Sequence, residues 1–132
     1  MTPHLGHGIG LRTKHYPQLL DGTLRADWFE VISENFMIDG GRPLRVLERA
    51  RTAAPVVLHG VGMNLLGQDP LDERYLDALC RLADRLDAPF VTDHLCWTGA
   101  RGVSHHDLLP VPFVPELVAL AAERAAYVQR RL

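Results

Sequence analysis

Short, largely apolar runs recur along this chain, separated by longer stretches whose apolar residues return every three or four positions. Runs of this length, rich in β-branched and aromatic residues and bounded by Gly, Pro or Asp, predict buried strands. Four such runs are present, at residues 5–11, 27–33 and 55–58 and within residues 88–97, where the run stops at Thr92, Asp93 and His94. The third run, Pro-Val-Val-Leu, is apolar throughout, which is typical of a parallel strand covered on both faces.

The longer stretches have the period of amphipathic helices. They cover about residues 43–53, 69–86 and 115–132, and a short helical turn is expected at residues 15–20. The helix over 69–86 has the clearest apolar stripe, which consists of Tyr75, Leu79, Leu82 and Leu86. We expect Asp69 to cap this helix and Pro70 to occupy its first position. Residues 98–112 show neither period and are expected to form a loop.

Strand and helix thus alternate in four consecutive βα units, which predicts an α/β fold with a parallel sheet. Two architectures fit this order: a small open sheet, or part of a (β/α)8 barrel. The barrel explains why the reactive candidates follow strands, since the carboxyl ends of the strands carry the chemistry in such barrels. These candidates are Glu34, Asn35, His59, Asp93 and His94.

The length of the chain favours half of such a barrel. A complete (β/α)8 barrel takes about 250 residues, and this chain has 132. We therefore interpret residues 1–132 as one domain, the N-terminal half of a TIM-type barrel that appears without its second half. The first and last strands of such a half would expose their edges, so self-association through the open edges is expected.

Composition narrows the class of protein without identifying it. With 47% hydrophobic residues, 23% charged residues and a net charge of −2, the chain resembles a soluble globular protein and lacks the basic footprint of a nucleic-acid binder. No apolar stretch approaches the roughly 20 residues of a membrane span. The first ten residues lack the basic and apolar order of a signal peptide. We expect a cytoplasmic protein in which Cys80 and Cys96 are free thiols.

The histidines carry the most chemical information. His59 and His94 follow the third and fourth predicted strands, one βα unit apart, so both imidazoles can reach one site. Imidazole together with carboxylate suits Fe, Zn or Mn. Glu34 and Asn35 add oxygen atoms from the end of the second strand, and Asp93 is placed to orient His94 or a substrate group. A histidine after a strand is also a common loop residue, and the pattern alone leaves that alternative open.

A second pair of histidines, His105 and His106, lies between Ser104 and Asp107 in the expected loop. Loops at strand ends often carry binding residues, and this one follows the fourth predicted strand. Exposed loop histidines without a function are equally common.

Five segments, taken together and in order, resemble one known family. They are GIGLR (residues 8–12), DWFEVISENFM (27–37), LHGVGMNL (58–65), VTDHLCW (91–97) and HHDLLPVP (105–112). They are similar to the DUF692 family, the multinuclear non-haem iron-dependent oxidative enzymes related to the methanobactin biosynthesis iron enzyme. The similarity covers all 132 residues.

The resemblance implies a (β/α)8 barrel with two or three irons at the carboxyl ends of its strands. It further implies that the iron uses O2 as co-substrate to modify cysteine residues of a ribosomally made precursor peptide by oxidation. A partner protein that binds the leader of the peptide is also expected.

The matched motifs imply a role for each candidate. His59 and His94 correspond to iron ligands, Asp93 and Glu34 to catalytic residues, and Asn35, His105 and His106 to residues that bind substrate. The family's further Glu, Asn, Asp and His ligands belong to the second half of the barrel, outside these 132 residues. The resemblance therefore leaves open whether this chain acts as an enzyme by itself.

Two other hypotheses fit the same residues. One is a different metal-dependent barrel enzyme, a hydrolase or isomerase similar to endonuclease IV or xylose isomerase, which would hold zinc or manganese and consume no oxygen. The other is a non-catalytic remnant that binds a partner through its open edges.

Overall fold

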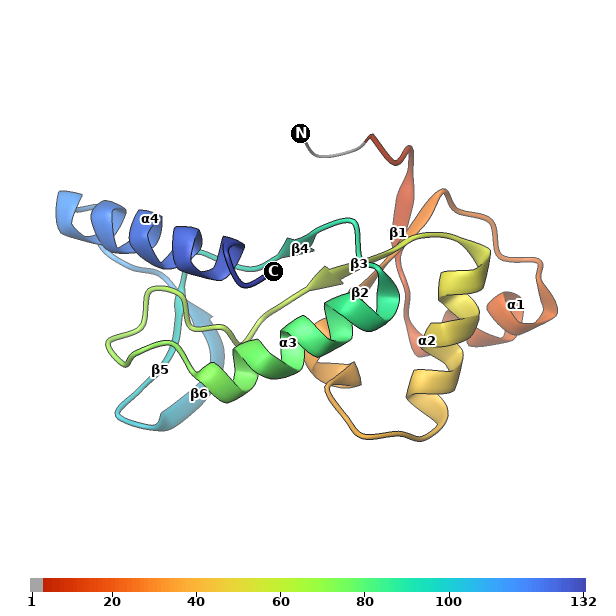
Figure 1. Ribbon diagram of the computed structural model, residues 1–132, viewed down its shortest axis with the longest axis horizontal. Coiled ribbons are helices and arrows are strands. Elements are labelled where there is room, and N and C mark those ends of the chain that lie inside the picture. Colours follow the sequence, from red (N-terminus) through yellow and green to blue (C-terminus); the bar gives the residue numbers. More distant parts are fainter. Residues whose placement is uncertain (1–3) are drawn as a thin grey trace.

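The structure, a computed structural model, describes residues 4–132, so the first three residues of the expected domain lie outside it. Strands and helices alternate along the chain (Figure 1). The elements are β1 (Gly8–Gly10), α1 (Tyr16–Asp21), β2 (Trp28–Ile32), α2 (Arg42–Ala53), β3 (Val56–His59), α3 (Glu73–Leu86), β4 (Val91–Thr92), β5 (Trp97–Ala100), β6 (Val103–Leu109) and α4 (Pro115–Gln129). Two short 3-10 turns, η1 (Thr13–His15) and η2 (Ser33–Phe36), follow β1 and β2.

The first four strands form one parallel sheet in the order β1-β2-β3-β4. Phe29 of β2 pairs with Val56 of β3, and His59 at the end of β3 pairs with Thr92 of β4. Parallel neighbours need crossover connections, and helices provide them here. The prediction of an α/β fold with a four-stranded parallel sheet is confirmed, and this sheet is compatible with half of a (β/α)8 barrel.

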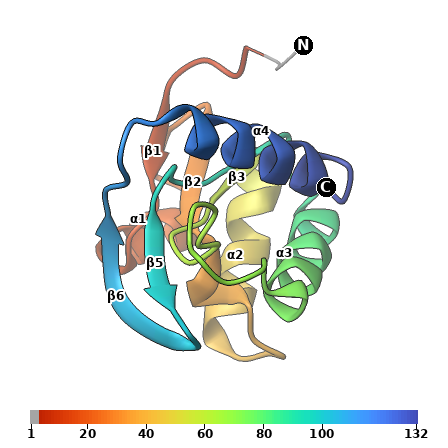
Figure 2. The same cartoon turned by 90° about the vertical axis from the view of Figure 1, so that its left-hand side faces the viewer.

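The core lies between the sheet and the helices α2 and α3, which Figure 2 shows beside the strands. Side chains alternate across a strand, so Phe29 and Val31 of β2 point to the same side, where they are 1% and 0% exposed. Leu79 of α3 belongs to the same cluster and is fully buried. The buried stripe of α3 begins at Leu76, while Tyr75 is only half-buried.

Residues 98–112 differ from the loop that was expected. Most of them form a hairpin, in which β5 and β6 pair in antiparallel fashion. Its turn consists of Arg101 and Gly102, with φ of 54° and 74°, the backbone that a tight two-residue hairpin turn needs. The prediction was wrong because residues 103–108 are exposed, so the strand shows no apolar period.

The prediction that Asp69 caps α3 is also wrong. The helix begins at Glu73, and Asp72 Oδ1 accepts hydrogen bonds from the N–H groups of Arg74 and Tyr75 at 2.9 and 3.4 Å. Asp69 Oδ2 instead accepts a hydrogen bond from the N–H of Gly102 at 3.0 Å. This contact joins the β3–α3 loop to the hairpin turn, and a tertiary contact of this kind leaves no local pattern in the sequence.

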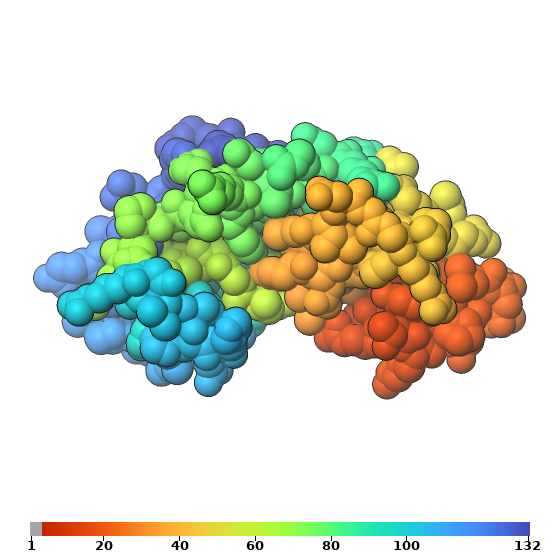
Figure 3. Space-filling view, turned by 90° about the horizontal axis from the view of Figure 1, so that it is seen from below, coloured from red at the N-terminus to blue at the C-terminus, as the bar shows by residue number. Residues whose placement is uncertain are grey.

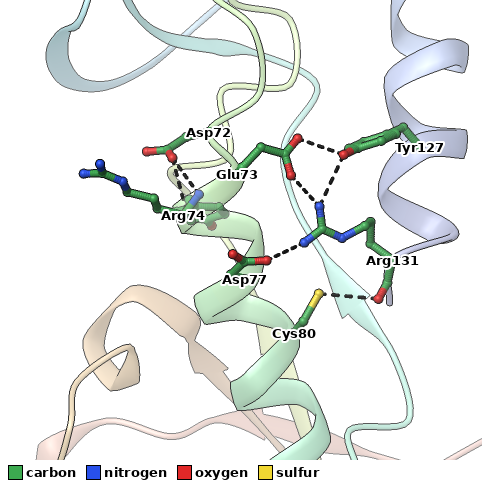
Figure 4. A network of polar contacts seen from close by, with 8 residues as sticks. Asp72, Glu73, Arg74, Asp77, Cys80, Tyr127 and Arg131 are labelled. Atoms are coloured by element: carbon green, nitrogen blue, oxygen red, sulfur yellow. Dashed lines mark hydrogen bonds and ion pairs between the residues drawn. The ribbon is translucent and has the colours of Figure 1, made fainter.

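Polar contacts hold α4 to the rest of the chain. Val128 is the one buried residue of this helix. Just beyond it, Arg131 forms ion pairs with Glu73 and with Asp77 of α3, the second at 2.5 Å (Figure 4). The Tyr127 hydroxyl donates a hydrogen bond to Glu73 at 2.8 Å. Exposed ion pairs contribute little stability, so α4 is held less firmly than α2 or α3.

Several apolar side chains remain exposed. Leu95 is 66% exposed, Val118 is 67% exposed, and Phe113 is fully exposed. In Figure 3 the N-terminal segment and the hairpin form two lobes with a hollow between them. Within residues 4–132, no helix is long and apolar enough to cross a membrane.

Replacing Asp72 with alanine tests the start of α3. This change removes the acceptor for two N–H groups in the first helical turn, so we expect the free energy of unfolding to fall by about 1 kcal/mol in a urea titration. Asp72→Asn is the matched control, since asparagine caps a helix equally well. Equal stability of the alanine variant and the original chain would contradict the assigned cap.

Candidate functional site

The imidazole rings of His59 and His94 lie side by side at the carboxyl end of the sheet. His59 is the last residue of β3, and His94 comes two residues after β4. The ring centroids are 4.7 Å apart, with an angle of 67° between the ring planes. The two strands are parallel neighbours that end together, which brings these side chains to one edge. Neutral imidazole nitrogens are common ligands of transition metals.

Each ring keeps a nitrogen that can take a ligand. His59 Nδ1 lies 2.8 Å from Thr92 Oγ1, which leaves Nε2 for another partner. His94 Nδ1 is buried and has no hydrogen-bond partner in the part of the chain that the structure describes.

Glu34 joins the end of β2 to the β3–α3 loop and to α3. Its Oε1 accepts three hydrogen bonds, from the N–H groups of Val61 and Gly62 at 2.8 and 2.7 Å and from the Tyr75 hydroxyl at 2.7 Å. This oxygen is therefore fully engaged. Oε2 is buried and receives no hydrogen bond from residues 4–132, so it is the oxygen available for chemistry.

Asp93 and Tyr75 both approach Gly60. A Cβ on Gly60 would lie 2.2 Å from Asp93 Oδ2 and 2.9 Å from the Tyr75 hydroxyl, so only glycine leaves room for them. Burial raises the pKa of Asp93, although the His94 N–H, which donates to Oδ1 at 2.6 Å, acts in the opposite direction. Burial and the hydrogen bond to Glu34 raise the pKa of Tyr75, so its hydroxyl keeps the proton that it donates.

Three polar atoms of this cluster are buried without a partner among the described residues: Glu34 Oε2, Asp93 Oδ2 and His94 Nδ1. Buried polar atoms are normally hydrogen-bonded, so these three indicate a ligand or further protein groups. Across residues 4–132, however, no three His, Cys, Asp or Glu side chains converge closely enough to hold a metal ion. The described residues thus do not form a complete metal site by themselves.

A cavity of about 610 Å³ opens beside the cluster. Glu34 and residues 61–64 line it on one side, and the hairpin, with His106, lines it on another. The carboxylates in its lining belong to Glu34, Asp69, Asp72 and Asp107, and the lining contains no lysine or arginine. Its charge therefore favours polar or cationic groups over anions.

Two of the three expected substrate-binding residues, Asn35 and His105, do not line this cavity. Asn35 is exposed in η2, and His105 is exposed on β6 with its ring centroid 5.4 Å from that of Trp97. His106 lines the cavity, in a left-handed backbone conformation with φ of 53°. The structure thus gathers His59, His94, Glu34 and Asp93, and it leaves Asn35 and His105 to one side.

Sequence reasoning missed the polar role of Tyr75 and of Thr92. Tyr75 was placed in the apolar stripe of its helix, and its hydroxyl instead reaches Glu34. A tyrosine in place of leucine at the start of a stripe is a usable signal, since a buried hydroxyl normally finds a partner. Thr92 stands directly before Asp93-His94, and the cross-strand register that pairs it with His59 is not visible in one sequence.

Two further side chains that were missed hold the β3–α3 loop. Asn64 has φ of 57°, and its Oδ1 accepts a hydrogen bond from the N–H of Thr98 at 2.7 Å. Arg124 of α4 donates hydrogen bonds to the carbonyl oxygens of Leu65, Gly67 and Asp69 at 3.0, 2.9 and 2.9 Å. Asparagine tolerates the left-handed conformation and is therefore a usable signal, whereas nothing local in the sequence marks the arginine.

Comparisons with known proteins match this chain over most of its length. A family model described as the RiPP precursor modification enzyme MbnB/TglH/ChrH matches residues 6–132; RiPPs are ribosomally made, post-translationally modified peptides. The chain is 48% identical over 128 residues to a UPF0276 protein of Anaeromyxobacter sp. and 48% identical over 130 residues to one of Caulobacter vibrioides. It is 40% identical over 132 residues to a UPF0276 protein of Acaryochloris marina.

These alignments cover 97%, 98% and 100% of this chain but 45%, 46% and 48% of the respective relatives. The chain thus spans about half the length of the curated relatives that it matches.

Gly60→Ala tests the close approach of Asp93 and Tyr75. The new methyl group would displace the buried Asp93 carboxylate, so we expect the free energy of unfolding to fall by about 1–3 kcal/mol in a urea titration. Gly40→Ala is the matched control, because nothing lies within 4 Å of its Cβ position. The control should keep or slightly raise the stability. Equal stability of both variants would show that Asp93 and Tyr75 do not pack against Gly60.

Proposed function

Because this chain belongs to the MbnB/TglH/ChrH family of RiPP precursor modification enzymes, the DUF692 family, we propose that it forms part of an iron-dependent oxidative centre. The centre would modify cysteine residues of a ribosomally made precursor peptide and use O2 as co-substrate. The observation that carries the proposal is the pair of imidazoles, His59 and His94, whose ring centroids are 4.7 Å apart.

His59 and His94 would hold iron through their ring nitrogens. Imidazole suits iron, and carboxylates commonly complete such sites. Two nitrogens do not fill a coordination sphere, and within the described residues no third ligand joins them. We propose that the remaining ligands come from the part of the relatives that this chain does not span. A full centre would then hold two or three irons.

Two carboxylates of this chain would accept protons near the metal. Bound iron would activate O2. Asp93 Oδ2 would accept the proton of a substrate thiol, because a raised pKa makes this carboxylate a stronger base. Glu34 Oε2 would provide a second oxygen acceptor, held in place by the three hydrogen bonds to Oε1. These two residues are the proposed catalytic pair.

The precursor peptide would enter through the cavity beside Glu34. His106 lines this cavity, and Asn35 and His105 are the chain neighbours of Glu34 and His106. We propose that these three residues contact the peptide, while a separate partner protein binds its leader. Membership of this family favours the proposed function over a zinc- or manganese-dependent hydrolase or isomerase.

We also propose that copies of this chain associate through the sheet edges. β1 and β4 are the outer strands of the sheet and carry unpaired backbone groups. The exposed Leu95 follows β4 closely and would be covered by such pairing.

An anaerobic Fe(II) titration tests the metal centre. We expect the chain to bind Fe(II) and expect His59→Ala and His94→Ala each to weaken binding at least about tenfold, since each removes a ligand. His4→Ala is the control, because His4 is exposed near the N-terminus. Binding that survives both ligand substitutions would contradict the proposed site.

The iron-loaded chain is then exposed to O2 with a cysteine-containing precursor peptide, and mass spectrometry follows the peptide. A mass change that requires O2, iron and His59 would support the function. Bound iron with no change in the peptide would contradict peptide oxidation by this chain, and tight zinc or manganese binding with no oxygen consumption would favour a hydrolase or isomerase.

Light scattering tests self-association. We expect a dimer whose fraction rises with concentration and falls when Leu95 is replaced by lysine, since a charge opposes burial of this side chain. The control is Leu20→Lys, at a position in α1 that is 50% exposed. A monomer at all concentrations would contradict pairing of the edges.

A further inference from the structure

We propose that Thr92 is a positioning residue that fixes the orientation and the tautomer of His59, so that Nε2 carries the lone pair offered to a metal. Thr92 lies at the end of β4, directly across from His59 at the end of β3. Its Oγ1 is 2.8 Å from His59 Nδ1. The inference rests on the proposed function in one respect, namely that His59 binds a metal ion.

The second contact of Thr92 supports one direction for this hydrogen bond. A threonine hydroxyl has one proton and two lone pairs. Thr92 Oγ1 lies 3.5 Å from the carbonyl oxygen of Leu58, which can only accept. If the hydroxyl proton points to that carbonyl, Oγ1 offers a lone pair to the ring, and His59 Nδ1 must be the donor. A neutral imidazole that carries its proton on Nδ1 has its lone pair on Nε2.

The backbone geometry makes this contact specific. His59 and Thr92 are paired in a parallel ladder, so their side chains lie on the same face of the sheet. The Leu58 side chain is fully buried, and the N–H of Gly60 donates to the carbonyl oxygen of Thr92 at 2.7 Å, so the backbone on both sides of the contact is fixed. The threonine is β-branched and has few side-chain rotamers, so its Oγ1 is held with little freedom.

Metal-binding histidines usually donate their second ring N–H to a protein oxygen, and loss of that partner weakens metal binding about 10- to 100-fold. The Thr92 hydroxyl is the one oxygen that contacts Nδ1 of His59 within residues 4–132. His94 has no equivalent contact there, because its Nδ1 lacks a partner in the described chain. The two imidazoles therefore differ, and His59 is the one whose orientation and tautomer are fixed before a metal binds.

The test compares Thr92→Val with Thr92→Ser. Valine keeps the β-branched shape but removes the hydroxyl, whereas serine keeps the hydroxyl. In the metal-free chain, long-range ¹H–¹⁵N spectra report which nitrogen of His59 is protonated. We expect the Nδ1–H form in the original chain and in Thr92→Ser, and a mixture of both tautomers in Thr92→Val. Circular dichroism checks that all three proteins are folded.

Fe(II) affinity is the second measurement. We expect about a 10- to 100-fold loss in Thr92→Val and retention of affinity in Thr92→Ser. An Nε2–H tautomer in the original chain, or a valine variant with an unchanged tautomer and unchanged affinity, would overturn the inference. If Fe(II) does not bind the original chain while the spectra behave as expected, the positioning role stands and the proposed iron centre fails.

Discussion

The register between β3 and β4 is the constraint on which the site depends. Successive side chains of a strand point to opposite faces, so a slip of one residue would turn the His59 ring towards the helices. Val56 and Leu58 point into the core beside the helices, and Val57, on the face that carries His59, is fully buried as well. In the observed register His59 pairs with Thr92. The register thus decides which polar groups meet at the carboxyl end of the sheet.

Glu34 plays a comparable part for the loop that follows His59. Its Oε1 links three segments, since the donors come from Val61, Gly62 and Tyr75 while the residue itself follows β2. At the other end of the loop, Arg124 binds three carbonyl oxygens. A loop held at both ends costs less entropy to order when a ligand binds, which suits a wall of a binding cavity.

The strands and the parallel sheet could be predicted because unbroken apolar runs such as residues 55–58 depend on local sequence alone. The same reasoning located His59 and His94, since each follows such a run. It failed where tertiary contacts decide the outcome. Residues 103–108 of the hairpin are exposed and lack an apolar period, and the choice of Asp72 over Asp69 as the cap depends on the contact between Asp69 and Gly102. The contact of the Thr92 hydroxyl with His59 depends on a distance between two strands and leaves no local trace.

The fold restrains the backbone of His59 more firmly than that of His94. His59 ends a strand with paired neighbours on both sides, whereas His94 follows β4, a two-residue strand at the edge of the sheet. An edge strand gains order when another strand pairs with it. A strand that paired with β4 would therefore restrain His94. On this argument, a strand paired with β4 and a ligand bound at His94 would both restrain the segment from Val91 to His94.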